Sequence, residues 1–271
     1  LFDRKKEGAA GKIVMWAYAA MRIADYLETR KETDMNNLAV VGHSRLGKTA
    51  LVTAAFDDRF KFCHSNCSGT CGAAAFFMRT KESEPISVIS SVFPHWFCAD
   101  FSKYSDKEKE LPFEQHMLMA LIAPRVMSVG SAVEDLWANP PAELYSAAKA
   151  SEIWTLYGEK PLENVKRPAL GEIYGDKVTY YVRKGKHFLS RDDWQRFLSV
   201  FDKNINYTIK KSAGIIMKIN FLGDSITAGA WLTSPNDKYT VLLCEKLGAT
   251  ENNYGISATR IARQTKPSEN A

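Results

Sequence analysis

The chain has 271 residues, of which 45% are hydrophobic and 25% are charged, a composition typical of soluble globular proteins. Its formal net charge of +5 comes from 36 basic and 31 acidic residues that are interspersed along the sequence. This pattern argues against a nucleic-acid-binding arm. No apolar run is long enough to span a bilayer, so we expect no membrane partner, and no signal peptide is recognisable.

The first part of the chain has the pattern of an α/β fold. Residues 9–28 carry apolar side chains at helical spacing, and the short apolar run at 38–41 predicts a buried strand. That strand leads into the glycine-flanked turn GHSRLGK at 42–48 and then into a helical run that reaches Ala55. A helix, a buried strand, a tight turn and another helix predict a parallel sheet.

Three more strands are expected before residue 205. They are the segments 62–67, 125–130 and 177–183. The second of them leads to the acidic turn Glu134-Asp135, and the third leads to His187. Residues 192–201 then predict an amphipathic helix that closes this first domain, for which we take residues 1–205.

A second domain is expected after a polar, lysine-rich stretch, of which residues 206–214 form the linker. It begins with a predicted strand at 215–222 and a glycine turn that contains Ser225, followed by a helix at 237–247 and a strand at 251–256. One strand–helix–strand unit cannot cover both faces of a parallel sheet. We therefore expect residues 215–271 to be only the first part of that domain.

The five cysteines give no metal-binding pattern. Cys63, Cys67 and Cys71 are spaced four residues apart, whereas Cys98 and Cys244 stand alone, and no second Cys or His pair follows at zinc-site spacing. We expect neither a metal nor another cofactor. The thiols are expected to be buried and free, with one disulfide among the first four as the alternative.

Ser44 lies between a buried strand and a helix and is flanked by glycines, which is typical of a nucleophile elbow. In that turn the hydroxyl is presented above the sheet, and the next backbone N–H points at a developing oxyanion. The spacing here is G-x-S-x-x-G, whereas the usual motif is G-x-S-x-G. The alternative is a loop serine that caps the following helix.

The order of the possible partners favours the elbow. In α/β-hydrolases the nucleophile is followed along the chain by the acid and then by the histidine. Asp135 and His187 follow Ser44 in that order, each after a predicted strand, where sheet folds place functional residues. His43 adjoins Ser44 and is expected to point away from its hydroxyl. The remaining histidines are expected to be structural: His64, His95 and His116.

Six ordered blocks within residues 10–200 carry a resemblance to a known family: GHSRLGK, SNCSGTCGAA, FPHWFCADFSKY, LPFEQHMLMALIAPR, SAVEDLWANP and GKHFLSRDDW. They resemble the bacterial branch of the glucuronoyl esterases, carbohydrate esterase family 15. The resemblance implies an α/β-hydrolase fold with a parallel sheet in a three-layer sandwich. It implies a secreted or periplasmic esterase that cleaves the ester between xylan 4-O-methylglucuronic acid and lignin alcohols. That fold has strands before the nucleophile strand, so we expect N-terminal strands to be missing from this chain.

The resemblance also implies roles for individual residues. Ser44 is the nucleophile and His187 the general base, while Arg45 serves the oxyanion through its backbone N–H and its guanidinium. Lys48 contacts sugar hydroxyls, and Trp137 lines the sugar pocket. The acidic sugar contact of fungal members has no clear match in the sequence.

The catalytic acid is the point at which the chain departs from the family pattern. Many members carry a catalytic Glu where this chain has Cys67, and a buried cysteine cannot stabilise an imidazolium as a carboxylate does. Some bacterial members carry the acid in the block that matches SAVEDLWANP. Asp135 is therefore the expected acid, with Glu134 as the second choice.

Residues 215–264 carry a second resemblance. The runs INFLGDSITAGA and NNYGISATRIARQ resemble the start of an SGNH (GDSL-type) hydrolase with a flavodoxin-like fold. Ser225 would be its nucleophile, and Gly255 would offer an oxyanion N–H. The later block with the base does not follow, so Ser225 is expected to be inert in this chain. A turn with a capping serine is the alternative, and Met217 is also compatible with the start of a second reading frame.

Two readings compete with the glucuronoyl esterase. One is another carbohydrate ester hydrolase, such as an acetyl esterase, in which the second domain defines the biology. The other is a non-catalytic fragment or a carbohydrate-binding remnant.

Overall fold

The computed structural model describes residues 8–163, 166–205, 217–221 and 249–253. The chain divides into two units, Leu1–Asn206 and Tyr207–Ala271, and each is described by itself.

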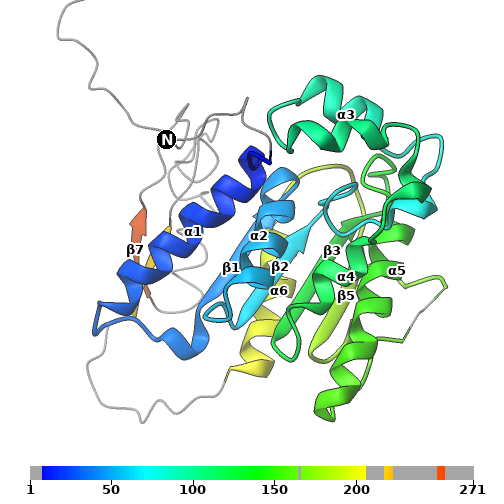
Figure 1. Cartoon of the computed structure of the whole chain (residues 1–271). Coiled ribbons are helices and arrows are strands. Elements are labelled where there is room, and N and C mark those ends of the chain that lie inside the picture. The colour runs from blue at the N-terminus through cyan, green and yellow to red at the C-terminus, as the bar shows by residue number, and fades with distance from the viewer. Residues whose placement is uncertain (1–7, 164–165, 206–216, 222–248, 254–271) are drawn as a thin grey trace, which may run out of the picture. The chain divides into compact units, whose positions relative to one another are not determined.

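The first unit is built around a five-stranded sheet (Figure 1). The strands lie in the order β1 (Ala39–His43), β2 (Phe62–Asn66), β3 (Val126–Ala132), β5 (Val178–Arg183) and β4 (Ile173–Gly175). The first four pair in parallel, and the short β4 runs antiparallel at the edge. The predicted mostly parallel α/β fold is therefore confirmed, and its four parallel strands coincide with the four predicted from the sequence to within about two residues.

Helices cover both faces of this sheet and give three layers. Figure 1 shows α1 (Lys12–Glu28), α2 (Arg45–Phe56), α4 (Gln115–Ala120) and α5 (Pro140–Ser151) on one side, and α6 (Arg191–Asn204) on the other. The helix α3 (Ile86–Val92) lies beyond the ends of the strands. Because both faces are covered, the three inner strands β2, β3 and β5 are buried along their whole length, whereas β1 is mostly half-buried.

Alternation along β2 divides the core between the two faces. Cys63 belongs to the large cluster that includes Leu51 of α2, while Phe62 packs on the opposite face against α6. The ring centroids of Phe62 and Phe201 are 4.4 Å apart. Successive strand residues point to opposite faces, so both faces of β2 contribute to the core, as in a parallel sheet that helices cover on both sides.

The helices α3, α4 and α5 were not predicted from the sequence. The start of α5 is encoded locally, because the side chain of Asn139 accepts a hydrogen bond from the backbone N–H of Ala142 and two prolines occupy the first helical positions. The disulfide alternative is wrong for the four cysteines that the structure describes, all of which are free: Cys63, Cys67, Cys71 and Cys98. Cys63 and Cys67 are buried as expected, whereas Cys98 is exposed.

The second unit contains two described strands. They are β6 (Met217–Phe221) and β7 (Ala249–Asn253), which pair in parallel. The predicted intervening helix, Ser225 and Gly255 lie outside the described residues. Within the part of the chain that the structure describes, no helix is long and apolar enough to cross a membrane.

Candidate active site

Ser44 occupies a strained turn between β1 and α2. Its φ of 57° and ψ of −125° lie in a region that non-glycine residues rarely adopt, and its side chain makes no capping hydrogen bond to α2. The alternative of a helix-capping serine is therefore wrong. A nucleophile elbow is the local structure in which such strain presents a hydroxyl outward.

The two glycines explain the unusual motif spacing. A Cβ on Gly42 would lie 1.9 Å from the backbone oxygen of Leu46, so the elbow admits no side chain there. A Cβ on Gly47 would lie 2.9 Å from the Cβ of Ser68, which follows β2. The second glycine lets α2 approach the neighbouring strand end, and it meets that requirement one residue later than in the usual motif.

Three side chains from three strand ends form one hydrogen-bonded chain. The Nε2 of His187 lies 2.9 Å from the Oγ of Ser44, and its Nδ1 lies 2.6 Å from the Oδ2 of Asp135. Ser44 follows β1, Asp135 follows β3 and His187 follows β5. The structure thus brings together the three residues that the sequence places after separate strands, in the geometry of a nucleophile, a base and an orienting acid.

Burial differs along this chain of residues. Asp135 is only 4% exposed, and its Oδ1 lies 3.4 Å from the backbone N–H of Ala138. The side chain of His187 is 43% exposed, so its imidazole faces solvent while the carboxylate of Asp135 is shielded. A shielded carboxylate is well placed to hold one imidazole tautomer, because little water competes for it.

Glu134, the second choice for the acid, has a different partner. Its carboxylate accepts a hydrogen bond of 3.0 Å from the backbone N–H of Gly185, and its own N–H donates to the backbone oxygen of Gly185 at 3.1 Å. Glu134 thereby ties the loop after β3 to the loop that carries His187.

Cys67 lies directly after β2 and is 1% exposed. Burial raises the pKa of its thiol well above the ordinary range, and the neighbouring carboxylates of Glu143 and Asp135 raise it further. The thiol is therefore neutral and cannot stabilise an imidazolium as a carboxylate would. This supports the choice of Asp135 as the acid.

A buried ion pair holds the loop of His187. The Nε of Arg183 donates to both carboxylate oxygens of Asp193 at 2.7 and 2.9 Å, and both side chains are almost fully buried. The two terminal nitrogens of Arg183 donate to the backbone oxygens of Lys186 and Phe188, the residues on either side of His187. The pair thus fixes the backbone on both sides of the base.

Asp193 is in turn fixed by the start of α6. Its carboxylate accepts hydrogen bonds from the N–H and hydroxyl of Ser190, the N-cap, and the Ser190 hydroxyl accepts from the N–H of Asp193. Burial opposes ionisation, but these bonds and Arg183 outweigh it and hold the pKa of Asp193 below its usual value. The sequence reasoning missed this arrangement, although S-x-x-D before an amphipathic helix is a capping-box signal.

His43 lies beside the base. Its ring centroid is 4.6 Å from that of His187, and its Nδ1 lies 2.8 Å from the Oδ1 of Asn66. Burial lowers the pKa of His43. His64 is fully buried with its Nδ1 3.1 Å from the Oγ of Ser128, and burial lowers its pKa to about 4. Its position inside the sheet matches the structural role expected of it.

Arg45 is the first residue of α2. The N–H groups of the first helical turn have no acceptor within the helix, so the N–H of Arg45 is available to an oxyanion beside Ser44. Its guanidinium carbon lies 5.8 Å from the ring centroid of Trp96.

Comparisons with known proteins identify the family. A family model described as glucuronyl esterase of fungi matches residues 1–158. The chain belongs to the glucuronoyl esterase family. A carbohydrate esterase from an unknown prokaryotic organism is 40% identical over 200 residues, which cover 74% of this chain and 46% of that protein. The 4-O-methyl-glucuronoyl methylesterase 1 of Phanerochaete chrysosporium is 30% identical over 138 residues, which cover 48% of this chain and 29% of that protein.

Solved structures of the family agree with this assignment. The glucuronoyl esterase from Solibacter usitatus superposes with a TM-score of 0.67 at 41% identity and covers 71% of this chain and 48% of its own. A promiscuous esterase of carbohydrate esterase family 15 from a marine bacterial metagenome gives 0.69 at 40% identity, with 72% and 49% coverage. The chain thus spans about half the length, or less, of the family members that it matches.

Lys48 and Trp137, which family resemblance assigns to the sugar pocket, lie in contrasting environments. Lys48 is 3% exposed, and its Nζ donates to the backbone oxygens of Ser68 and Thr70 at 2.5 and 2.6 Å. Trp137 is 47% exposed. Lys48 is therefore not a solvated helix lysine, and Trp137 is not a core aromatic.

Glu84 joins these two residues and was missed by the sequence reasoning. One of its carboxylate oxygens lies 3.8 Å from the Nζ of Lys48, its N–H donates to the backbone oxygen of Trp137 at 3.0 Å, and the Trp137 side chain hydrogen-bonds to it. Burial raises the pKa of Glu84, although Lys48 acts in the opposite direction. A carboxylate, an ammonium group and an exposed aromatic ring thus lie together, and the carboxylate of Glu84 interacts electrostatically with His187 and Asp135.

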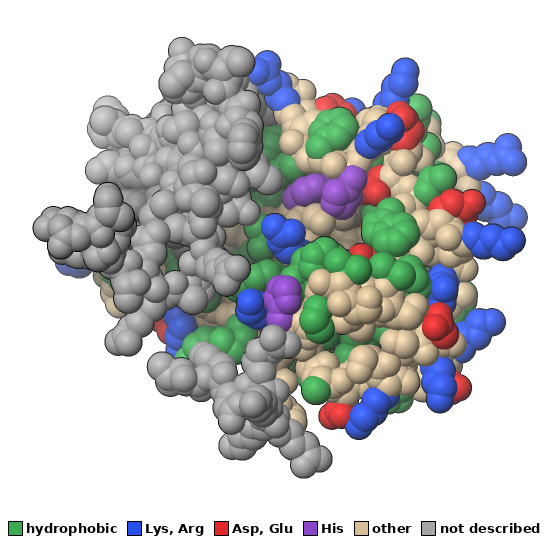
Figure 2. Space-filling view, turned by 90° about the horizontal axis from the view of Figure 1, so that it is seen from above, with side chains coloured by type: hydrophobic (Ala, Val, Ile, Leu, Met, Phe, Trp, Pro, Cys, Tyr) green, Lys and Arg blue, Asp and Glu red, His purple; other side chains and the backbone are tan. Residues whose placement is uncertain are grey.

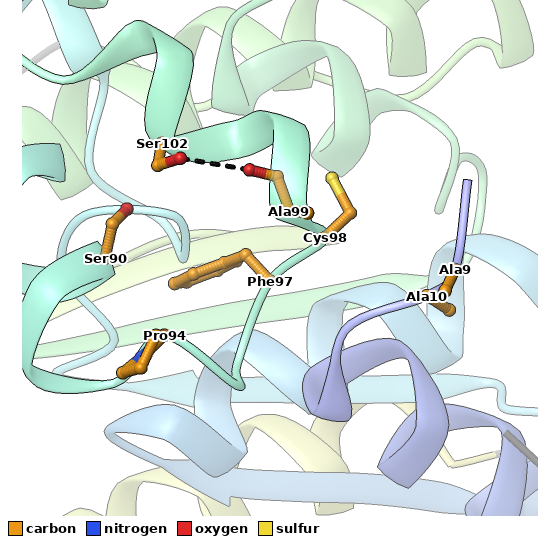
Figure 3. Close-up of a pocket in the computed structure, with 8 residues that line it drawn as sticks. All are labelled: Ala9, Ala10, Ser90, Pro94, Phe97, Cys98, Ala99 and Ser102. Carbon is orange, nitrogen blue, oxygen red and sulfur yellow. Dashed lines mark hydrogen bonds between the residues drawn. The ribbon is translucent and has the colours of Figure 1, made fainter. Parts of the chain in front are cut away.

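The surrounding surface is mixed in character. Viewed from above, the described part of the chain shows histidine side chains beside hydrophobic and basic ones (Figure 2). A separate pocket of about 280 Å³ lies between the start of α1 and the segment after α3 (Figure 3). Its lining is mostly small or apolar and includes none of Ser44, Asp135 and His187. It offers no acid and base for ester chemistry.

Glu143 of α5 supports the site from within the core. It is fully buried, and its carboxylate accepts hydrogen bonds from the N–H of Gly69 at 2.9 Å and the hydroxyl of Ser131 at 2.6 Å. Burial raises the pKa of Glu143 to about 7, although these hydrogen bonds favour the charged form. The carboxyl group therefore couples the stability of this region to pH.

The Glu143→Gln variant is expected to change the pH dependence of stability. Between pH 4.5 and about 7 the folded protein keeps a proton on Glu143 that the unfolded chain releases. The free energy of unfolding therefore falls as pH rises through this window, by about 1 kcal/mol per pH unit. Glutamine cannot ionise and retains both hydrogen-bonding partners. The free energy of unfolding of the Glu143→Gln variant, relative to that of the parent, should therefore rise by on the order of 2–3 kcal/mol from pH 5 to 7.5.

Urea unfolding of both proteins at the two pH values measures this difference. The matched control is Glu152→Gln, which removes an exposed carboxylate paired with Lys149. That variant should keep a constant offset from the parent, because an exposed pair contributes little to stability. An equally constant offset for Glu143→Gln would show that Glu143 does not retain its proton in the folded state.

Proposed function

We propose that this protein is a serine esterase that hydrolyses the ester between the 4-O-methylglucuronic acid of xylan and lignin alcohols. The observation that carries the proposal is the hydrogen-bonded chain of Ser44, His187 and Asp135 at three strand ends. Membership of the glucuronoyl esterase family supports the substrate class, because several relatives carry the name 4-O-methyl-glucuronoyl methylesterase.

The geometry supports an acyl-enzyme mechanism. His187 accepts the Ser44 proton at Nε2, and the serine oxygen attacks the uronoyl carbonyl. The N–H of Arg45 stabilises the oxyanion, and the imidazolium returns its proton to the departing alcohol. Asp135 stabilises the imidazolium through Nδ1. Water then hydrolyses the acyl-enzyme by the same route, with no metal or cofactor in the scheme.

Lys48, Glu84 and Trp137 supply the sugar side of the proposed site. An ammonium group has three donors, and two of them are directed to the backbone oxygens of Ser68 and Thr70. The third remains for Glu84 or for a sugar hydroxyl. Glu84 offers an acceptor for such a hydroxyl, and Trp137 offers an apolar wall for the ring face.

This arrangement predicts selectivity for the acyl half of the ester. The protein should hydrolyse methyl glucuronate esters far better than a simple acetate ester, since only the uronate has a ring to contact the three residues. Trp137→Ala, Glu84→Gln and Lys48→Ala should each reduce this preference by on the order of 1–3 kcal/mol, or about 5–150-fold in the ratio of kcat/KM values.

The matched control is Leu136→Ala, which removes an exposed apolar neighbour of Trp137 and should leave the preference unchanged. Unfolding measurements accompany Lys48→Ala, because that variant leaves two buried backbone oxygens without their donor. Equal kcat/KM for methyl glucuronate and acetate esters, unchanged in the variants, would favour a general acetyl-type esterase.

Two finer proposals rest on family and sequence resemblance. We infer that the enzyme is secreted or periplasmic, because polymeric xylan and lignin lie outside the cell that produces it. We also infer that residues 215–271 begin an SGNH-type hydrolase domain with Ser225 as its nucleophile. The parallel pairing of β6 with β7 is compatible with the strand–helix–strand start of such a domain.

A further inference from the structure

One group of potential metal ligands lies within the described residues, and it overlaps the candidate triad. Cys67, Asp135 and His187 each offer one ligand atom, and these three atoms all lie within 4.8 Å of one another. They follow β2, β3 and β5, three neighbouring strands of the sheet. The sequence spacing of the cysteines gave no indication of this group, because its members come from different strand ends.

The distances are close to those that zinc requires. A tetrahedral zinc ion with bonds of about 2.0–2.3 Å sets neighbouring ligand atoms roughly 3.4 Å apart. The Nδ1 of His187 and the Oδ2 of Asp135 are 2.6 Å apart, so that contact must open by about an ångström. The remaining separations need only contract by a similar amount, which small side-chain rotations can supply.

The charge around the thiol favours a cation. The carboxylates of Asp135 and Asp193 act on Cys67, against the single guanidinium of Arg183, so one negative charge is in excess. Cys67 and Asp135 are buried, so a bound ion would be shielded from water on that side. The exposed ring of His187 forms the outer wall, and its rotation opens a path from solvent.

We propose that Cys67, Asp135 and His187 form an inhibitory site for a thiolate-preferring divalent cation, with Zn²⁺ as the representative ion. A neutral imidazole, a carboxylate and a thiolate are ligands that zinc accepts, and a water molecule completes the fourth position. When the ion binds, the thiol proton passes to solvent and the single imidazole proton moves from Nδ1 to Nε2. The members of the family that carry a glutamate in place of Cys67 would lack the soft ligand.

Metal binding and catalysis exclude each other at this site. With the ion on Nδ1, the neutral imidazole carries its proton on Nε2 and donates it to the Oγ of Ser44. His187 then has no free nitrogen with which to accept the Ser44 proton. The ion also displaces Asp135 from its hydrogen bond, so the imidazolium loses its stabilising partner.

Cobalt titration of the whole protein tests the site without any assay of activity. Co²⁺ should bind with one-to-one stoichiometry and give a near-ultraviolet thiolate-to-cobalt charge-transfer band that added Zn²⁺ abolishes. Cys67→Ala should lose the band, whereas Cys98→Ala, which removes an exposed thiol, should keep it. Ser44→Ala should also keep the band, because the nucleophile is not a ligand.

Inhibition provides the second measurement. Zn²⁺ should inhibit ester hydrolysis, EDTA should restore it, and Cys67→Ala should need on the order of 10–100-fold more Zn²⁺ for the same inhibition, since even outer-shell changes weaken metal sites by that much. His187→Ala, with its exposed ring removed, gives a second variant that should lose cobalt binding. A cobalt spectrum without the thiolate band, or one that is unchanged in Cys67→Ala, would overturn the proposal whatever the esterase activity proves to be.

Discussion

Replacing Ser44 with alanine is expected to lower kcat on a methyl glucuronate ester by about 10⁶-fold, the scale of loss when a serine nucleophile is removed. The elbow leaves no substitute, because its backbone strain presents this one side chain to His187. Removal of the hydroxyl leaves only the binding groups and the oxyanion N–H to accelerate hydrolysis.

The double variant Ser44→Ala/His187→Ala gives the sharper test. Residues that act as one catalytic unit lose activity non-additively, so the double variant should be no less active than Ser44→Ala alone. Ser102→Ala, which removes an exposed hydroxyl that donates to the backbone oxygen of Ala99, serves as the control and should retain full kcat. A further large loss in the double variant would mean that His187 acts independently of Ser44.

Much of the fold and the candidate triad could be predicted because they depend on the ends of strands. Continuous apolar runs indicate buried parallel strands, and the carboxyl ends of parallel strands meet at one edge of a sheet. Ser44, Asp135 and His187 each follow a predicted strand, so their positions at strand ends and their order along the chain predicted that they meet. The two glycines around Ser44 permit the close approach of α2 to β1 and to the end of β2 in this turn.

The residues that the sequence did not reveal depend on contacts between loops. Glu84 lies in a polar segment without periodicity, and nothing local indicates that it contacts Trp137, which is more than fifty residues away. Helical spacing places Lys48 near Ser44 but does not show that the residues after β2 cover it. The Arg183–Asp193 pair likewise joins a strand end to a helix start, and only the capping-box half of it is visible in the sequence.

The identity of the acid can be decided by changing three neighbouring positions. Asp135→Asn is expected to lower kcat by about 10⁴-fold, because an amide at this position favours the wrong imidazole tautomer and cannot stabilise the imidazolium. Glu134→Gln should have a much smaller effect, since Glu134 contacts the N–H of Gly185. Cys67→Ala should change kcat little in metal-free buffer, because the neutral thiol contributes no charge to the imidazolium.

Comparing kcat with the free energy of unfolding in these variants separates a catalytic acid from a structural carboxylate. Without the carboxylate of Asp135, the imidazolium of His187 loses its favourable charge partner, and the protonated form becomes less stable. The loss should therefore appear in the kcat of the folded Asp135→Asn enzyme, whereas Glu134→Gln and Cys67→Ala should retain most of their kcat. If Cys67→Ala caused the 10⁴-fold loss and Asp135→Asn were nearly fully active, the acid would have been assigned to the wrong strand end. A purely structural role for Asp135 would instead lower the free energy of unfolding and leave the kcat of the remaining folded enzyme unchanged.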